Sequence, residues 1–516
     1  MQKVTLSDAW YKRISIGFGA LILMYVFWRA VHVSITHDEG STTDLLFVSV
    51  DDIMFSPQCF QTANNHILSS LLMKLSAACF GTSAWALRLP NVLAFGFYFA
   101  GTYLFVREST SNNVLRFCGL VLMNSAIYLL DFFSLARGYG LANGFAMFSL
   151  GCMLSSFRTH SSSLRNLSFI FAALAAYANF TWLHFYVAIS LAFICLRFVQ
   201  EPSLINRIRP LLRQMMVPIF ITLVLLLLSW KPISFLRQQD EFRWGASSWW
   251  EAQRTLARDI LYETEDTVSY GLQWAMNVVL LLSALVIGNF IFTKRGMHSQ
   301  LRPMLLFAIL FMGVSMLSVV QHYLMGTMYM DGRKATMYIS LLFGLLFLLI
   351  VRLSTQRCSM AISLASILSL LAVWHFFAYR SPNTIREWWY DENDKAVANY
   401  IANHPIDAHC GVAVHWKFYP SFQYYNRFCY QDKFQPLRCV EDLSGKDTVA
   451  YYYVEGDESR VVPISYQALG RFGNRILFAK QHHQQNQGQE IADSIRQKER
   501  AALDWNALPD IKKIIR

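Results

Sequence analysis

A long apolar run that ends abruptly in polar residues decides the fold class: ISIGFGALILMYVFWRAVHVSITHDEG, residues 14–40. Its apolar part, near 14–34, is long enough to cross about 30 Å of hydrocarbon as one helix. The run lacks the small-residue cleavage site of a removable signal peptide, so we expect it to remain as a membrane span. His37, Asp38 and Glu39 then emerge at a membrane surface, and their role depends on the side that they face.

The composition supports a membrane protein. The chain has 516 residues, of which 54% are hydrophobic and 15% are charged. Soluble domains are typically about 45–50% apolar and about 25% charged. The net charge of +11 arises mainly from Lys and Arg in short segments between apolar runs. The cytoplasmic bias of positive loops and the attraction of anionic headgroups account for these residues, so we exclude nucleic acid as a partner.

Further apolar runs predict a polytopic α-helical protein with about eleven transmembrane helices. Short segments rich in Lys and Arg, such as RESTSNNVLR (107–116) and RTHSSSLR (158–165), are expected in the cytoplasm. An odd number of spans then leaves the N-terminus inside and the C-terminal region outside. The runs lie near 14–34, 87–106, 114–131, 139–157, 166–181, 183–199, 214–230, 271–292, 303–322, 336–352 and 359–378.

Two domains are predicted, a transmembrane domain over 1–378 and an extracytoplasmic domain over 379–516. Outer loops 35–86 and 231–270 contain apolar residues at helical spacing and tryptophans, which favours helices lying in the membrane interface. Region 379–516 mixes alternating runs with a helix-like stretch, which predicts a small α/β domain, periplasmic if the membrane is a bacterial inner membrane. Its last thirty or so polar residues are expected to attach loosely.

Asp38 and Glu39 are the first candidates for chemistry, because an acid at an outer surface can accept a proton from an attacking hydroxyl or amine. Such a pair can also be a solvated helix end. Polar residues at the outer ends of other predicted spans favour a site, since all of them face the same compartment. These are His66, Asp131, Arg137, Tyr139, His184, Tyr329, Asp331, Arg333 and Lys334.

Arginines near a membrane surface bind phosphate bidentately or extend to the headgroups. For Arg137 alone, the second role is the more frequent one. Arg333 differs, because MYMDGRKATMY (328–338) combines a turn, paired charges and tyrosines directly before a span. His66 and His184 are weaker candidates, since a lone histidine near an interface is more often an anchor.

The order of three motifs resembles the membrane glycosyltransferases of the GT-C fold. The motifs are HDEG (37–40), the segment from NNHILSSLL (64–72) to ALRLPN (86–91), and SLARGYGLANGF (134–145). They are similar to the branch that contains protein O-mannosyltransferases and lipid A aminoarabinose transferases. There an Asp-Glu pair follows the first span, and an Arg-x-Tyr helix comes later. NHILSSLL replaces a Pro-containing motif, and only the first 150 residues carry specific motifs.

The resemblance implies an inverting transfer of a sugar from a polyprenyl-phosphate-linked donor to an extracytoplasmic glycan, lipid or protein. Asp38 would activate the acceptor, Glu39 would orient Asp38 or bind the acceptor, and Asp131 would be a second acid. Arg137, Arg333, His66 and Lys334 would bind the donor phosphate. The remaining substrate contacts would come from His184, Tyr139, Tyr329 and Asp331.

No cofactor is required by the sequence. A divalent cation is conceivable beside Asp38, Glu39 and Asp131, but no ligand spacing demands one. Two other classes remain open. A lipid or sugar transporter would place ionisable residues near the midplane and often shows repeats, neither of which is seen here. A membrane scaffold with an outer binding domain would leave the polar residues at the other outer loops unexplained.

Overall fold

The computed structural model describes residues 7–200, 204–262, 266–293, 301–406, 410–439, 449–456, 462–463, 465–472 and 475–480. The expected loose C-terminal tail lies outside these residues. The chain divides into two compact units, and each is described by itself. Unit 1 comprises 1–33 and 44–389, and unit 2 comprises 34–43 and 390–516.

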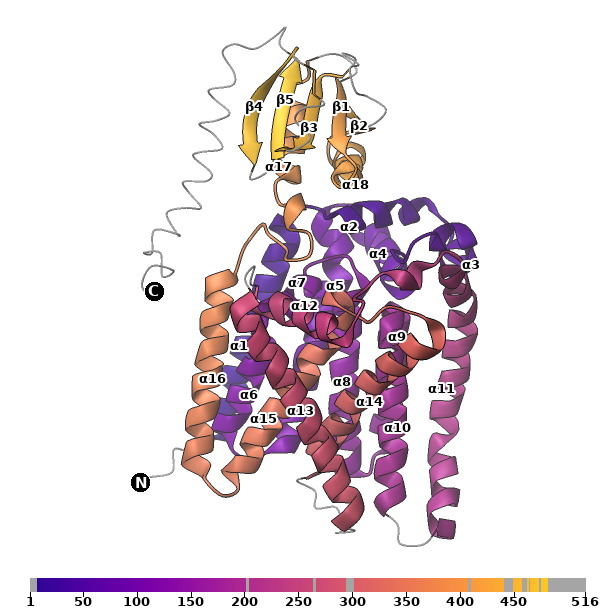
Figure 1. The fold of residues 1–516 in the computed structure, drawn as a ribbon, viewed down its shortest axis with the longest axis vertical. Helices are drawn as coiled ribbons and strands as arrows, with labels where there is room; N and C mark the ends of the chain where they lie inside the picture. Colours follow the sequence, from indigo (N-terminus) through magenta and orange to yellow (C-terminus); the bar gives the residue numbers. More distant parts are fainter. Residues whose placement is uncertain are drawn as a thin grey trace. The chain divides into compact units, whose positions relative to one another are not determined.

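Unit 1 is a bundle of long apolar helices that lie side by side (Figure 1). In the described part of the chain, nine helices are long and apolar enough to cross a membrane. They are α1 (Asp8–His32), α5 (Ala84–Ser109), α8 (Gly138–Thr159), α10 (Leu183–Gln200), α11 (Leu204–Gln238), α13 (Asp266–Thr293), α14 (Arg302–Met325), α15 (Met337–Ser354) and α16 (Cys358–Tyr379). Apolar side chains and internally bonded backbones suit helices to hydrocarbon.

The predicted number of spans was close to the observed one. Run 114–131 is a broken span, because α6 (Asn113–Asn124) and α7 (Ile127–Phe133) meet at a bend of 66°. Counting this pair gives ten candidate spans among the described residues. Run 166–181 corresponds to α9 (Ser162–Ala178), whose 17 residues lie at the lower end of the roughly 17–25 residues of a span, so that counting it gives the odd number that the sequence predicts. The predicted class, a helical polytopic protein with a small C-terminal α/β region, is confirmed.

Helix α8 forms the centre of unit 1 and is buried along nearly its whole length. It packs against α5 and α9. Two glycines allow the close approach to α5: a Cβ on Gly101 would collide with the Met147 carbonyl oxygen, and one on Gly144 with that of Ala94. Small residues permit such contact between helices in membranes. The centre of the bundle therefore holds the start of α8, where Arg137 and Tyr139 lie, in a fixed position.

Short elements occupy the segments predicted as outer loops. Their apolar residues recur at helical spacing, which explains why these segments fold as helices. In unit 1 they are η1 (Thr43–Phe47, from Asp44), α3 (Val50–Phe55), η2 (Pro57–Phe60), α4 (Ile67–Phe80), η3 (Phe180–Trp182), η4 (Glu241–Arg243), α12 (Trp249–Leu261) and η6 (Gly332–Ala335).

Unit 2 contains a five-stranded sheet of order β2-β1-β3-β5-β4. The central strands carry β-branched and aromatic residues and are buried on both faces. β1 runs parallel to β2 and β3, whereas β5 runs antiparallel to β3 and β4. The strands are β1 (Cys410–His415), β2 (Phe434–Cys439), β3 (Tyr451–Glu455), β4 (Tyr466–Phe472) and β5 (Arg475–Lys480).

Helical elements complete unit 2, and one of them comes from the start of the chain. They are α2 (His37–Thr42), η7 (Trp389–Asp391, from Tyr390), α17 (Asp394–Asn403), α18 (Tyr419–Tyr424) and η8 (Tyr425–Cys429). Helix α2 packs on α18, where a Cβ on Gly40 would collide with the Pro420 carbonyl oxygen. The Ile35 amide also donates to the Tyr425 hydroxyl at 2.8 Å. The polar stretch after the first span therefore folds with the C-terminal α/β unit.

Candidate functional site

Unit 1 gathers four of the predicted site residues into one cluster, which we call the cation cluster: His66, Arg137, Tyr139 and Arg333. Arg137 caps the start of α8, and His66 caps the start of α4. The Arg137 guanidinium donates to the backbone oxygen of Asn64 at 3.0 Å and to its side-chain oxygen at 3.2 Å. The His66 ring meets the Tyr139 ring edge-on, with centroids 4.9 Å apart.

Arg333 joins the cluster from η6. Its Nε donates to the Tyr139 hydroxyl at 3.1 Å, and its guanidinium lies over the Trp388 ring at 4.8 Å. A third of the Arg333 side chain is exposed, whereas Arg137 is fully buried. Arg333 is therefore the arginine of the cluster that retains access to a ligand.

His66 occupies an electropositive and buried position. Burial lowers the pKa of His66 well below 6.5, and the charges of Arg137 and Arg333 lower it further. The imidazole is therefore neutral near pH 7, with one donor and one acceptor nitrogen. Its Nε2 is buried and has no hydrogen-bond partner among the residues that the structure describes. A buried polar atom of this kind requires a partner, such as a water or a ligand.

Carboxyl groups that the sequence analysis did not single out surround Arg333. Glu387 accepts the Arg333 amide at 2.9 Å and pairs with its guanidinium at 3.5 Å. The Tyr128 hydroxyl donates to the same carboxylate. Gly332 permits this arrangement, since its φ is +47° and a Cβ there would lie 2.8 Å from a Glu387 oxygen. These contacts fix the backbone and the guanidinium of Arg333 together.

Asp259 of α12 adds a proton-sensitive group to this region. Burial raises the pKa of Asp259 to about 7, and the charge of Glu387 adds to the effect. The Arg386 guanidinium, 3.4 Å away, lowers it. The negative charge beside η6 therefore increases as the pH rises through 7.

Asp131, a predicted second acid, makes its ion pair and hydrogen bonds with residues outside the cation cluster. Its carboxylate forms a buried ion pair with Arg29 at 2.6 Å. It also accepts the Tyr262 hydroxyl and, at 3.1 Å, the Arg386 amide. These contacts tie α1, α7 and the segment before unit 2 to one another, as a structural bridge would.

Among the other predicted residues of unit 1, Lys334 and Asp331 lie at the edge of the cation cluster. The contacts of Tyr329 and His184 are with residues outside it. Lys334 pairs with Asp331 at 2.8 Å and donates to the Trp244 carbonyl, directly beside Arg333 in the chain. Tyr329 is buried, stacks on His322 and pairs with Ala246 through the backbone, so its contacts are those of core packing. His184 bonds the Thr181 carbonyl at 3.0 Å, within its own turn.

Unit 2 holds the predicted pair of acids, and the structure separates their local roles. Thr36 and Glu39 form a capping box, in which the Glu39 carboxylate accepts the Thr36 amide at 3.0 Å. The backbone amides of Thr36 and Glu39, which have no partner within the helix, each donate to the side chain of the other residue. The Asp38 carboxyl, which is also buried, takes no part in this cap. Glu39 therefore fixes the turn that carries Asp38.

Two further acids, Asp391 and Asp394, lie with Asp38 in unit 2. The His37 amide donates to Asp391 at 2.7 Å, and the Ser421 hydroxyl donates to Asp394. Burial raises the pKa of Asp394 to about 8. Burial also raises the pKa of Asp391 well above 3.8, and the charges of Asp394 and Asp38 add to this shift. The Asp391–Asp394 pair therefore retains a proton near pH 7.

A divalent cation at the acids named by the sequence would need ligands from both units, because Asp38 and Glu39 belong to unit 2 and Asp131 to unit 1. Among the described residues, no group of three or more His, Cys, Asp or Glu side chains is arranged to hold a metal ion. No step below involves one.

Four residues of these clusters escaped the sequence analysis: Glu387, Trp388, Asp391 and Asp394 all lie in or near REWWYDEN (386–393). The aromatic residues of this stretch suit a carbohydrate-stacking surface and packing equally well, and Trp388 is buried against Arg333. The capping box was visible in the sequence, because Thr36 precedes Glu39 by three residues. No sequence signal connects Asp259 with Arg333.

No protein-family model matches the chain, and no curated protein matches it either. Several solved structures are similar. ArnT from Cupriavidus metallidurans bound to undecaprenyl phosphate has 10% identity and a TM-score of 0.43, covering 92% of this chain and 98% of its own. The oligosaccharyltransferase AglB from Archaeoglobus fulgidus, in complex with an inhibitory peptide and a dolichol-phosphate, has 11% identity and a TM-score of 0.45, covering 87% and 70%.

The arabinofuranosyltransferase AftD from Mycobacteria has 14% identity and a TM-score of 0.40, with 93% of this chain and 42% of that chain covered. All three are GT-C fold membrane glycosyltransferases, the group that the motifs resemble. At TM-scores below 0.5, these similarities assign no activity and no site residue to this chain.

Proposed function

We propose that this protein is an inverting membrane glycosyltransferase that moves a sugar from a polyprenyl-phosphate-linked donor to an extracytoplasmic acceptor. The observation that carries the proposal is the cation cluster, in which two arginines and a tyrosine lie around neutral His66, whose buried Nε2 has no hydrogen-bond partner in the described part of the chain. A phosphate has the charge and the acceptor oxygens that such a group of donors requires.

Each residue of the cation cluster has a distinct task in this proposal. Arg333, held by Glu387 and Trp388, donates to the phosphate and stabilises the charge that grows on it as the sugar departs. His66 donates an uncharged hydrogen bond through Nε2, and Arg137 supplies positive charge from its buried position. Tyr139 keeps the Arg333 guanidinium and the His66 ring in their orientations. Lys334, Asp331, Tyr329 and His184 are proposed to bind the remainder of the substrates.

Asp38 of unit 2 is the proposed general base. It removes the proton from an acceptor hydroxyl or amine as that atom forms a new bond to the anomeric carbon. The bond from the anomeric carbon to the phosphate oxygen breaks in the same step, which inverts the configuration. The electron pair of that bond leaves with the polyprenyl phosphate. Glu39 orients Asp38 through the capping box.

Asp131 serves this proposal as a positioning residue, through its ion pair with Arg29. The N-terminus is proposed to be cytoplasmic and unit 2 to face the opposite side, following the charge bias of the loops. Labelling of thiols introduced at exposed Ser111 and exposed Trp416 from the two sides of sealed vesicles tests this orientation. Opposite accessibility of the two positions is expected.

The phosphate site can be tested without knowing the sugar. Farnesyl phosphate and farnesol have the same apolar tail, and only the first carries the phosphate. We expect the full-length protein in nanodiscs to bind farnesyl phosphate at least about tenfold more tightly, as hydrogen bonds to charged groups contribute about 1.5–3 kcal/mol. Equal affinity for both probes would refute a phosphate site in the cation cluster.

A second experiment separates a transferase from a transporter. Cell-envelope glycans are compared by mass spectrometry with and without the protein, to identify the missing sugar. The corresponding polyprenyl-phosphate donor and a cell-envelope extract that contains the acceptor are then supplied to detergent-solubilised protein, where no compartments exist. A transferase releases polyprenyl phosphate and forms product under these conditions. If loss of the protein depletes the glycan in cells but the solubilised protein shows no turnover in detergent, the protein would instead be a transporter or flippase.

A further inference from the structure

A cavity of about 620 Å³ lies in unit 1 where four helices begin or end. It lies at the end of α8 that carries Arg158, whereas Arg137 caps the other end. The 22 residues of α8 separate these ends by about 33 Å at 1.5 Å per residue. The charged residues that line the cavity are Asp8, Lys12, Arg107, Glu108, Arg116 and Arg158.

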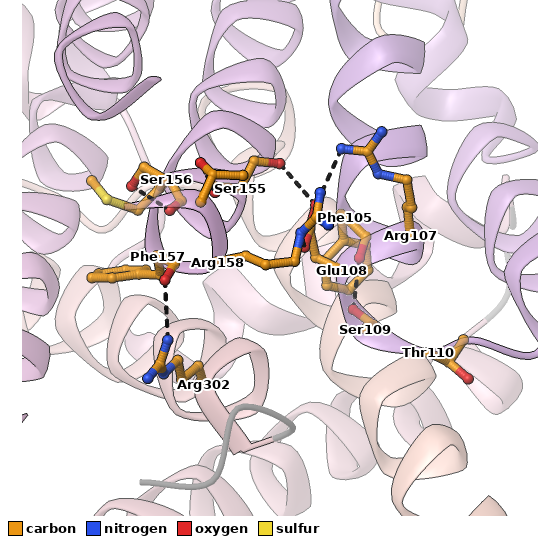
Figure 2. A network of polar contacts seen from close by, with 12 residues as sticks. Phe105, Arg107, Glu108, Ser109, Thr110, Ser155, Ser156, Phe157, Arg158 and Arg302 are labelled. Carbon is orange, nitrogen blue, oxygen red and sulfur yellow. Dashed lines mark hydrogen bonds and ion pairs between the residues drawn. The ribbon is translucent and has the colours of Figure 1, made fainter. Parts of the chain in front are cut away.

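Glu108 organises one wall of this cavity (Figure 2). Its carboxylate pairs with Arg158 at 2.6 Å and with Arg107 at 3.2 Å, and it accepts the Ser155 hydroxyl at 3.1 Å. The Glu108 side chain is 4% exposed, whereas those of Arg107 and Arg158 are 39% and 59% exposed. One buried carboxylate thus shares its charge between two accessible guanidinium groups.

Arg116 also lines the cavity, and its guanidinium forms no ion pair with an acid among the described residues. Its three guanidinium nitrogens donate to the Thr110 carbonyl at 2.6 Å, the Asn113 side chain at 2.8 Å and the Arg107 carbonyl at 3.3 Å. All three acceptors are neutral. Lys12 forms no ion pair with any residue in the described ranges. The four cations and two acids of the lining therefore leave a net charge of +2.

The position of the cavity indicates that an anion bound there would come from a lipid headgroup. The lining belongs to the ends of α1, α5 and α8, which are candidate membrane spans, so the cavity lies at the level where lipid headgroups lie. Next to it on α1, Trp10 and Ile14 expose 59% and 37% of their surface. Such apolar side chains suit the acyl chains of a lipid whose headgroup enters the cavity.

We propose that this cavity binds the phosphodiester headgroup of an anionic phospholipid. The accessible guanidinium groups of Arg107 and Arg158 bond the phosphate oxygens, and Lys12 and Arg116 add charge. The apolar side chains of α1 carry the tail. This site is independent of the cation cluster and of the proposed transfer reaction.

Native mass spectrometry of the full-length protein tests the proposal, with phosphatidylglycerol and phosphatidylcholine of identical chains as probes. Wild type is expected to retain phosphatidylglycerol preferentially. Lys12→Gln should reduce this retention about fivefold, because a cation near the headgroup contributes about 1 kcal/mol. Arg13→Gln is the matched control, since Arg13 is exposed on the same helix and does not line the cavity. Asp8→Asn should increase retention.

Three results would overturn the assignment. Equal retention of the two lipids would remove the requirement for an anionic headgroup. An equal loss in Arg13→Gln and Lys12→Gln would indicate general surface charge instead of this cavity. Displacement of phosphatidylglycerol by millimolar inorganic phosphate would show that the cavity takes a free anion. Thermal unfolding of each variant verifies that it is folded, and Lys12→Gln removes no described ion pair.

Discussion

The two units contribute different groups to the proposed reaction: arginines that Glu387 partly balances in unit 1, and buried acids in unit 2. Unit 1 presents Arg137 and Arg333 around a neutral histidine, whereas unit 2 gathers Asp38, Asp391 and Asp394. Phosphate recognition needs permanent positive charge, which arginine supplies at every physiological pH. Proton acceptance needs an ionised acid. Because the Asp391–Asp394 pair retains a proton, it adds less negative charge beside Asp38 than a fully ionised pair would. Under the proposed function, donor binding and proton transfer therefore belong to different compact units of the chain.

If that division is correct, substitutions in unit 2 change the rate and leave donor binding intact, and substitutions in unit 1 change donor binding.

Asp38→Asn is expected to have the largest effect. The amide keeps the shape of the side chain but cannot accept the proton, and general-base assistance contributes about 10²–10⁴-fold in rate. Turnover of the donor should fall by that factor, while the affinity for farnesyl phosphate stays unchanged. A variant with near wild-type turnover would remove Asp38 from the mechanism, and a variant with weakened probe binding would break the division between the units.

Arg333→Ala should have the converse effect. It removes the accessible guanidinium of the cation cluster, so the affinity for farnesyl phosphate should fall about 10- to 100-fold, as expected for a charged hydrogen bond of about 1.5–3 kcal/mol. Arg243→Ala is the control, because Arg243 is 62% exposed and lies outside the cluster. Similar losses in both variants would show that general charge, and not the cluster, attracts the probe.

The Asp391–Asp394 pair predicts a pH-dependent stability of unit 2. Because burial raises the pKa of Asp394 to about 8, folding favours its protonated form. Its contribution is fully present below about pH 4, the ordinary pKa of Asp, and is lost as the pH rises through about 8. Asp391, Arg475 and Tyr453 face Asp394, and the charge of Asp38 acts on Asp391.

Asp394→Asn, which imitates the protonated acid, should therefore flatten the decrease of Tm between pH 5 and pH 9. Wild type should lose several degrees over this range, since about 1 kcal/mol corresponds to about 2–4 °C for domains of 150–250 residues. Thermal unfolding followed by intrinsic fluorescence measures the slope. An unaltered slope in the variant would place the titrating group elsewhere.

The sequence predicted much of unit 1, because a membrane imposes strong rules on composition and length. Apolar runs located every long helix that the structure describes, and the bend between α6 and α7 was missed because Ser125 and Ala126 do not interrupt the hydropathy. The convergence of His66, Arg137, Tyr139 and Arg333 was expected from their shared membrane face. Tertiary packing of α4, α8 and η6 then produced it.

The assignment of Ser34–Thr43 to the C-terminal unit was not predictable in the same way. It depends on Gly40 meeting Pro420 and on Asp391 accepting the His37 amide, contacts between segments more than 350 residues apart. Hydropathy and local spacing contain no information on such pairs. For the same reason, the sequence did not indicate that Asp391 and Asp394 accompany Asp38.

Glu39→Gln is expected to have the smallest effect, and it tests how unit 2 positions its base. Glutamine also completes a capping box. The cap on α2 should therefore weaken by less than the roughly 0.5–2 kcal/mol that full removal of a cap costs. Because Glu39 orients Asp38 and does not accept the proton, turnover should fall by less than about tenfold, with farnesyl phosphate binding unchanged. A Glu39→Gln variant without activity, combined with an active Asp38→Asn variant, would exchange the two roles. In that outcome, the carboxylate of the cap would be the base, and the neighbouring acid would serve only to hold the turn.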